Sequence, residues 1–202
     1  MSKINKIAIL IDAGFFKQCF RKLNNKKDPT KKDVEDLIES IVKKVQEKSN
    51  KIEIDILFRT FYYDCLPYGE IKKHPDGSEY NFSTTDTYKT QTNFINSLKD
   101  IEQFAMRLGE VSFSGWKINP SRIPEKIVPD LRQKGVDMKI GLDMAWLAGK
   151  KTIDKIVLVA GDADFISPIK FVRKEGLLVY LYPMNNPVKS ELKEHCDFVL
   201  EP

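Results

Sequence analysis

Val157-Leu-Val-Ala-Gly-Asp-Ala-Asp-Phe165 is the stretch of this 202-residue chain that decides the fold. An uninterrupted apolar run reaches Gly161 and is followed by sequence compatible with a helix. This is the pattern of a buried parallel strand that leads into a helix. Ligands of open α/β sheets bind at the carboxyl ends of such strands. Asp162 and Asp164 therefore lie where we expect the chemistry of the protein.

A second apolar strand ends in an acid near the N-terminus. Lys6-Ile-Ala-Ile-Leu-Ile-Asp12 has the same character, and Gly14 allows a tight exit from it. Two strand ends that carry acids predict one shared acidic site. Carboxylates about 4 Å apart repel by roughly 4 kcal/mol per pair at an effective dielectric near 20. Such a cluster persists by protonation or by binding a cation, and all-oxygen ligation favours Mg²⁺ or Mn²⁺ over zinc.

Strands alternate with helices along the chain, which predicts an α/β fold. We expect a three-layer α/β/α sandwich with a mainly parallel central sheet of about five to six strands. The expected strands cover residues 6–12, 52–63, 110–118, 156–159, 177–182 and 198–200. The expected helices cover residues 15–23, 31–48 with Thr30 as N-cap, 86–108, 136–148, 163–174 and 190–194.

No repeat or linker divides the chain, so residues 1–202 are expected to form one domain. Residues 119–131, rich in proline, are expected to be irregular. Residues 65–85 are expected to form a loop or hairpin insertion that turns at Asp76-Gly77. This insertion is a candidate substrate clamp over the site, and an oligomerisation hairpin or a simple loop are the alternatives.

Composition narrows the class of protein further. No apolar run approaches the roughly 20 residues of a membrane span, and Met1 is not followed by a signal-like hydrophobic region. The three cysteines are odd in number and widely spaced, which fits reduced thiols and predicts a cytoplasmic protein. No Cys-x-x-Cys pair indicates a thiolate zinc site. His74 and His195 are expected at the surface.

A third acidic segment opens the helix expected over residues 136–148. Asp137 lies at the positive end of that helix, where a carboxylate gains about 0.3–1 kcal/mol, and from there it can reach Asp12 and Asp162. An ordinary helix acid is the alternative for Asp137, and a turn with an N-cap is the alternative for Gly-Asp-x-Asp. Asp143 is six residues further on, about 600° around the helix, so we expect it to support the site without binding the ion.

Three linked motifs resemble the NYN domain of LabA-type proteins, a family of the PIN-like nuclease superfamily. The motifs are residues 11–15, 134–143 and 159–168, and the resemblance covers nearly the whole chain. It implies a PIN-like fold and RNA cleavage supported by a carboxylate-bound Mg²⁺ or Mn²⁺. By motif match, the catalytic and metal-site carboxylates would be Asp12, Asp137, Asp162 and Asp164, supported by Asp143 and Ser167.

One departure from the family pattern follows the first aspartate. Many relatives carry Asn there, whereas this chain reads Ala13-Gly-Phe-Phe16. A polar contact that positions the substrate is therefore missing or replaced in this chain.

The predicted reaction is hydrolysis of an RNA phosphodiester by in-line attack of water, which leaves a 5′-phosphate and a 3′-hydroxyl. Single-stranded RNA requires a basic groove and aromatic faces on which bases stack. The candidate substrate contacts are Arg59, Tyr63, Lys72, Lys73 and Lys139. Core packing is the alternative for Tyr63. A homodimer is also expected.

The main alternative function is a non-catalytic PIN-like module that binds RNA or a protein partner. A glycosyltransferase that uses Asp-x-Asp would not by itself explain the motif at Asp12. A phosphatase built on an N-terminal Asp-x-Asp is disfavoured because the paired acids come late in the chain.

Overall fold

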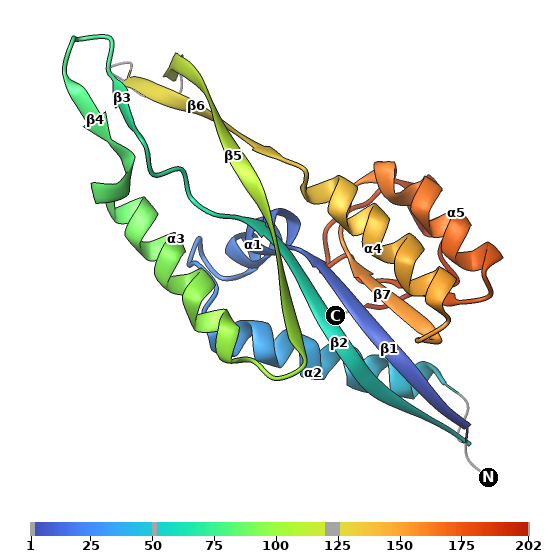
Figure 1. Cartoon of the computed structure of the whole chain (residues 1–202). Coiled ribbons are helices and arrows are strands. Elements are labelled where there is room, and N and C mark those ends of the chain that lie inside the picture. The colour runs from blue at the N-terminus through green and yellow to red at the C-terminus, as the bar shows by residue number, and fades with distance from the viewer. Residues whose placement is uncertain (1–2, 50–51, 120–125, 202) are drawn as a thin grey trace.

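A computed structural model describes residues 3–49, 52–119 and 126–201. Its middle layer is a seven-stranded sheet of order β6-β5-β2-β1-β7-β8-β9 (Figure 1). The strands are β1 (Lys3–Asp12), β2 (Glu53–Cys65), β5 (Phe104–Asn119), β6 (Lys126–Lys134), β7 (Lys155–Val159), β8 (Leu178–Leu181) and β9 (Phe198–Val199). Every neighbouring pair is parallel except β5 and β6. The predicted mainly parallel sheet is confirmed, with one strand more than expected.

Helices cover both faces of this sheet. They are α1 (Ala13–Leu23), α2 (Lys31–Lys48), α3 (Asp86–Ser97), α4 (Val136–Lys150), α5 (Ile166–Lys174) and α6 (Ser190–Glu194), with short 3₁₀ turns η1 (Phe82–Thr84), η2 (Leu98–Asp100) and η3 (Ala163–Phe165). In Figure 1, α1 and α2 lie behind the sheet, and α4 and α5 lie in front of it. Phe94 of α3 packs in the same cluster as α1 and α2. The predicted three-layer α/β/α sandwich is therefore confirmed. None of these helices, within the described segments, is long and apolar enough to cross a membrane.

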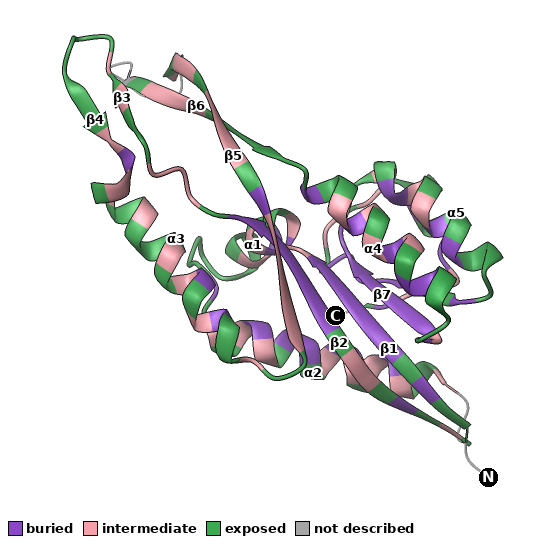
Figure 2. Ribbon diagram, viewed as in Figure 1, coloured by how far each residue is buried: buried purple, intermediate pink, exposed green. Residues whose placement is uncertain are grey.

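The neighbouring strands β1 and β7 are buried on both faces, as Figure 2 shows. On β1, Ala8 and Leu10 pack in the cluster that includes α4 and α5, whereas Ile7, Ile9 and Ile11 pack in the cluster that includes α1 and α2. Burial on both faces is why β1 and β7 appear in the sequence as continuous apolar runs instead of alternating ones.

The expected N-cap of the second helix is confirmed. The Thr30 side chain accepts the Asp33 amide, and the Asp33 carboxylate accepts the Thr30 amide, which makes a capping box. The helix expected over residues 86–108 is wrong in its second half, because α3 ends at Ser97 and β5 begins at Phe104. Phe104 packs on the α1–α2 side of the sheet and Ala105 on the α4–α5 side, which is strand alternation that mimics helical spacing over a few residues.

The irregular segment expected at 119–131 is also wrong for its described part. Residues 126–134 form β6, which pairs antiparallel with β5. Pro129 is tolerated because β6 is an edge strand, where a missing N–H breaks no ladder on the open side. Residues 120–125 lie outside the described residues. A single residue, Gly135 at φ 79°, joins β6 to α4.

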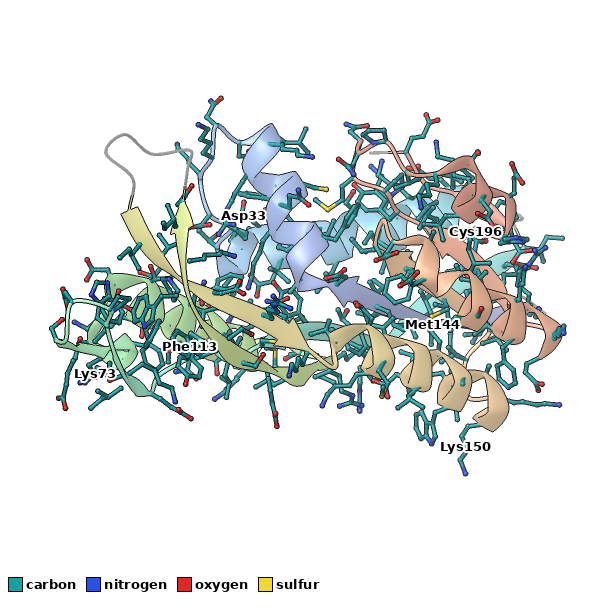
Figure 3. All side chains as sticks on the ribbon, turned by 90° about the horizontal axis from the view of Figure 1, so that it is seen from above. Asp33, Lys73, Phe113, Met144, Lys150 and Cys196 are labelled. Atoms are coloured by element: carbon teal, nitrogen blue, oxygen red, sulfur yellow. The ribbon has the colours of Figure 1, made fainter. Side chains whose placement is uncertain are left out.

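The insertion contains a second, two-stranded sheet of β3 (Ile71–Lys73) and β4 (Glu79–Asn81). It packs against β5 through aromatic rings, with Tyr80 and Phe82 edge-on to Trp116 or Phe113, and Trp116 Nε1 donates to the Lys73 carbonyl at 2.9 Å. β2 pairs with β5 only as far as Cys65. Beyond that point the β3–β4 pair and the β5–β6 pair continue together, and we call them the arm (residues 68–82, 111–119 and 126–134). Lys73 and Phe113 lie together at this end in Figure 3.

The amino edge of the sheet holds a buried ion pair. Lys155 of β7 is 2% exposed, and its Nζ lies 2.7 Å from Oδ1 of Asp55 on β2. The same ammonium donates to Ser49 Oγ, at the end of α2, at 2.6 Å. The pair thereby connects three elements across the sheet.

We expect Lys155→Met to lower the free energy of unfolding by about 3–5 kcal/mol, because it leaves the Asp55 carboxylate buried without its partner. The double variant Lys155→Met/Asp55→Asn removes both charges and is expected to recover part of that loss. Urea unfolding followed by circular dichroism measures both. Equal destabilisation of the single and double variants would contradict an electrostatic role for the pair.

Candidate active site

The order of the central strands places two acids at one edge. β1 lies between β2 and β7 and is parallel to both, with Ile11 opposite Val159. Asp12 is the last residue of β1, and Asp162 follows β7 by three residues. Both therefore lie at the carboxyl edge of the sheet. The first turn of α4, which contains Asp137, joins them there.

A cavity of about 500 Å³ opens at this edge. Asp12, Asp137 and Asp162 all line it, so the structure brings together three of the four candidate carboxylates. The other polar side chains of its lining are Gln18, Gln133, Asn186 and Lys189. Asp164 is not part of the lining, although its charge reaches Asp137.

Asp12 is held in place by the start of α1. Its Oδ1 accepts the amides of Gly14 at 2.9 Å and Phe15 at 3.2 Å, and so forms the N-cap of that helix. Within the described residues, Oδ2 makes no hydrogen bond. Burial raises the pKa of Asp12, the bond from Phe15 lowers it, and the charges of Asp137 and Asp64 raise it again.

Asp162 and Asp137 complete the cavity's acidic lining. Asp162 Oδ1 accepts the Asp164 amide at 3.0 Å, which fixes one oxygen as the cap of η3. Asp137 makes no hydrogen bond or ion pair within the described part of the chain. Its pKa is raised by desolvation first and then by the charges of Asp162 and Asp164. The three carboxylates therefore repel one another across the cavity.

These donors fit a hard divalent cation. All are carboxylate oxygens, and each aspartate of the lining has at least one oxygen free of other contacts. Among the described residues, no three His, Cys, Asp or Glu side chains form a ready-made metal cluster. Mg²⁺ does not require one, because it is usually bound by one or two carboxylates together with water and substrate phosphates.

Asp143 lies away from the cavity, against the sheet. Its Oδ2 accepts the Tyr63 hydroxyl at 2.9 Å and Arg107 Nε at 2.8 Å, and so connects α4 to β2 and β5. Asp143 thus makes a structural contact between α4 and the sheet, and its support of the site stays a prediction. Ser167, expected to support the site as well, is exposed on α5 and makes no hydrogen bond among the described residues.

Tyr63 does not lie where a stacking residue is needed. It is fully buried, and burial followed by the charge of Asp143 raises the pKa of its hydroxyl. A ring packed under α4 has no face to offer a base, so the expectation of a substrate contact is corrected to core packing.

The expected basic contacts are scattered. Arg59 pairs in register with Ala8, four positions before Asp12, and its guanidinium lies 5.7 Å from the Phe58 ring centroid. Lys139 is partly buried in the first turns of α4, two residues after Asp137.

The two lysines of the insertion lie on the arm. Lys72 Nζ is 2.9 Å from Glu70 Oε2 and lies over the rings of Tyr68 and Phe113. Neither Lys72 nor Lys73 lines the cavity. A clamp by the arm stays a prediction.

Sequence reasoning missed a buried ion pair beside the cavity. Asp64, 2% exposed at the end of β2, is bound by Lys17 of α1, and its charge acts on Asp12. The rule that identified Asp12 applies equally to Asp64, since both acids end a parallel strand. Asn186 and Lys189 lie in a segment between β8 and α6 that carries no comparable sequence signal.

Comparison with solved structures gives a match to a protein of unknown function, VPA0982, from Vibrio parahaemolyticus RIMD 2210633. The sequences are 12% identical, the TM-score is 0.49, and the match covers 97% of this chain and 91% of that chain. Comparison with curated proteins gives no match.

The family model of the NYN domain matches residues 6–201. This range includes all three sequence motifs and each of the carboxylates that line the cavity. The chain therefore belongs to the NYN domain family, a member of the PIN-like nuclease superfamily.

Proposed function

We propose that this protein is a metal-dependent ribonuclease that hydrolyses phosphodiester bonds of single-stranded RNA. The observation that carries this proposal is the convergence of Asp12, Asp137 and Asp162, from three separate segments, on one cavity. Two of them have raised pKa values because of burial and mutual repulsion, and a bound cation would relieve that repulsion.

Asp12 and Asp162 are the residues we assign to hold a Mg²⁺ or Mn²⁺ ion, with Asp137 next. When bound, such an ion offsets charge on the phosphate and makes the attacking water more acidic. We assign Asp164, which lies just outside the cavity lining, to orient that water or to add a ligand. The backbone amides bonded to Asp12 and Asp162 fix both carboxylates before the ion arrives, which lowers the cost of ordering them.

The net charge of the chain and the state of its cysteines support the partner and the compartment that we propose. A single-stranded polyanion is the substrate class, since the chain is basic overall with a formal net charge of +4. Cys19, Cys65 and Cys196 are buried and free, which supports a reducing compartment such as the cytoplasm. Homodimer formation stays a prediction.

A non-catalytic RNA-binding or protein-binding module is the second candidate. The observation that favours it is the segment after Asp12, where Ala13 and Gly14 offer no polar side chain to position a substrate. Both candidates predict RNA or protein binding, but only the nuclease predicts cleavage that depends on metal and on the cavity aspartates.

Asp12→Asn and Asp162→Asn are each expected to abolish Mn²⁺-dependent cleavage of a labelled single-stranded RNA, because each removes a charged ligand. Asparagine keeps an acceptor oxygen for the cap, so both variants are expected to fold. Gel analysis of the products measures the effect, and circular dichroism checks the fold. Asp36→Asn on the exposed face of α2 is the matched control. Cleavage at the wild-type rate in either cavity variant would sink the assignment.

Asp12→Asn is also expected to stabilise the metal-free protein at pH 7. The folded-state pKa of Asp12 is raised, so its ionised form costs stability above that pKa, and the cost is relieved as pH falls through it. Each 1 kcal/mol of relief corresponds to about 2–4 °C in thermal midpoint for a chain of this size.

Differential scanning fluorimetry between pH 7 and acid, with and without Mn²⁺, tests both signs. Mn²⁺ should raise the midpoint of the wild type and have little effect on Asp12→Asn. Asp12→Ala, which loses the cap as well, should instead be less stable by about 1 kcal/mol. An equal Mn²⁺ shift in wild type and Asp12→Asn would place the ion elsewhere.

A further inference from the structure

Residues 183–189, between β8 and α6, form part of the same cavity as the carboxylates. Two side chains of this segment line the cavity, the amide of Asn186 and the ammonium of Lys189. Lys189 is the one cationic side chain among the described residues of that lining. The segment thus adds hydrogen-bond donors and positive charge to a cavity that is otherwise acidic.

The segment is anchored to the body of the protein. Met184 is 7% exposed and packs in the core cluster formed with α1 and α2. The backbone N–H of Asn186 donates to the Pro183 carbonyl at 2.8 Å, which closes a turn. Met184 and Asn185 both have positive φ, 51° and 57°, an uncommon conformation for two successive residues other than glycine. The surrounding structure therefore determines where Asn186 and Lys189 lie.

A second lysine orients the amide of Asn186. Lys22 Nζ, in the last turn of α1, donates to Asn186 Oδ1 at 3.1 Å. With its oxygen engaged, Asn186 presents its Nδ2 group as a donor. That group makes only a long contact, 3.4 Å, to the Pro187 carbonyl. Asn186 and Lys189 thus supply the cavity with an amide and an ammonium donor, and Lys22 holds the amide from outside the lining.

A phosphate group fits this donor set. Carboxylates and a phosphodiester repel, so a nucleic acid strand can approach Asp12 and Asp162 only where cations offset the charge. Ammonium and amide donors are groups that contact phosphate oxygens in nucleic acid complexes.

We propose that Lys189, with Asn186 and Lys22 beside it, binds a backbone phosphate of the RNA strand next to the bond that is cleaved. The choice of RNA rests on the proposed nuclease function, whereas the phosphate contact does not. Lys189 is a positioning residue in this assignment.

Fluorescence anisotropy with a labelled single-stranded RNA 12-mer in EDTA tests the contact without cleavage. Lys189→Ala should weaken binding severalfold and reduce the slope of log affinity against log salt by about 0.7, the value for one phosphate contact on a single strand. Lys189→Arg should restore both. No side-chain hydrogen bond of Lys189 caps α6, so alanine is tolerated there. A DNA 12-mer of the same sequence tells whether the 2′-hydroxyl adds to the contact.

Lys193→Ala is the matched control, because it removes the same charge four residues further on, within α6, at a side chain that does not line this cavity. Equal losses in Lys189→Ala and Lys193→Ala, or no binding by the wild type at low salt, would overturn the subsite.

Steady-state cleavage separates this proposal from the nuclease proposal. If the protein cleaves RNA, Lys189→Ala should raise KM and leave kcat nearly unchanged. If the protein does not cleave RNA but Lys189→Ala still reduces the salt slope of binding, the nuclease proposal alone is overturned and the phosphate subsite stands. A fall in kcat with unchanged KM and unchanged salt slope would overturn the subsite.

Discussion

The parallel pairing of β1 with β7 is the constraint on which the candidate site depends. Because Ile11 and Val159 lie opposite each other, both strands end at the same edge and their acids meet across it. A shift of one residue in this register would also turn the apolar side chains of β1 to the wrong faces of a sheet that is buried on both sides. Core packing therefore fixes the position of the carboxylates more firmly than any contact among the carboxylates themselves. The repulsion among Asp12, Asp137 and Asp162 is a local cost that the surrounding core has to offset.

The repulsion among carboxylates is confined to the carboxyl edge of the sheet, and the amino edge holds its buried charge in another way. At the amino edge, Lys155 neutralises Asp55 in the interior, so charge is buried as a pair. At the carboxyl edge, Asp64 is also paired, with Lys17, whereas Asp12 and Asp137 have no cationic partner in the part of the chain that the structure describes. Unpaired acids next to paired ones are the pattern expected where function, and not stability, determines the residues. At both edges a buried acid is paired with a lysine, whereas the acids that line the cavity have no such pair within the described segments.

Much of this arrangement could be predicted from the sequence because it is local. The strands that end at Asp12 and Val159, the cap at Thr30 and the acid at the start of α4 each follow from residues a few positions apart. The failures were non-local. β6 exists because it pairs with β5, and Pro129 in its middle weakens the local strand signal. In the sequence, Phe104 and Ala105 fit helical spacing and strand alternation equally well. Only their packing on opposite faces of the sheet identifies a strand. Tyr63 is an ordinary strand tyrosine in the sequence, and its burial comes from packing against α4, which is distant in the chain. Lys189 acquires its position from the path of a loop that no spacing rule describes.

Gly135 is the single residue between the last strand of the arm and the first turn of α4. β6 lies on one side of it, and Asp137 follows two residues later on the other. The backbone that carries one acid of the cavity is therefore joined directly to the arm. A side chain at position 135 would stiffen this joint as well as strain it, since φ 79° is a conformation that glycine adopts freely and other residues rarely do.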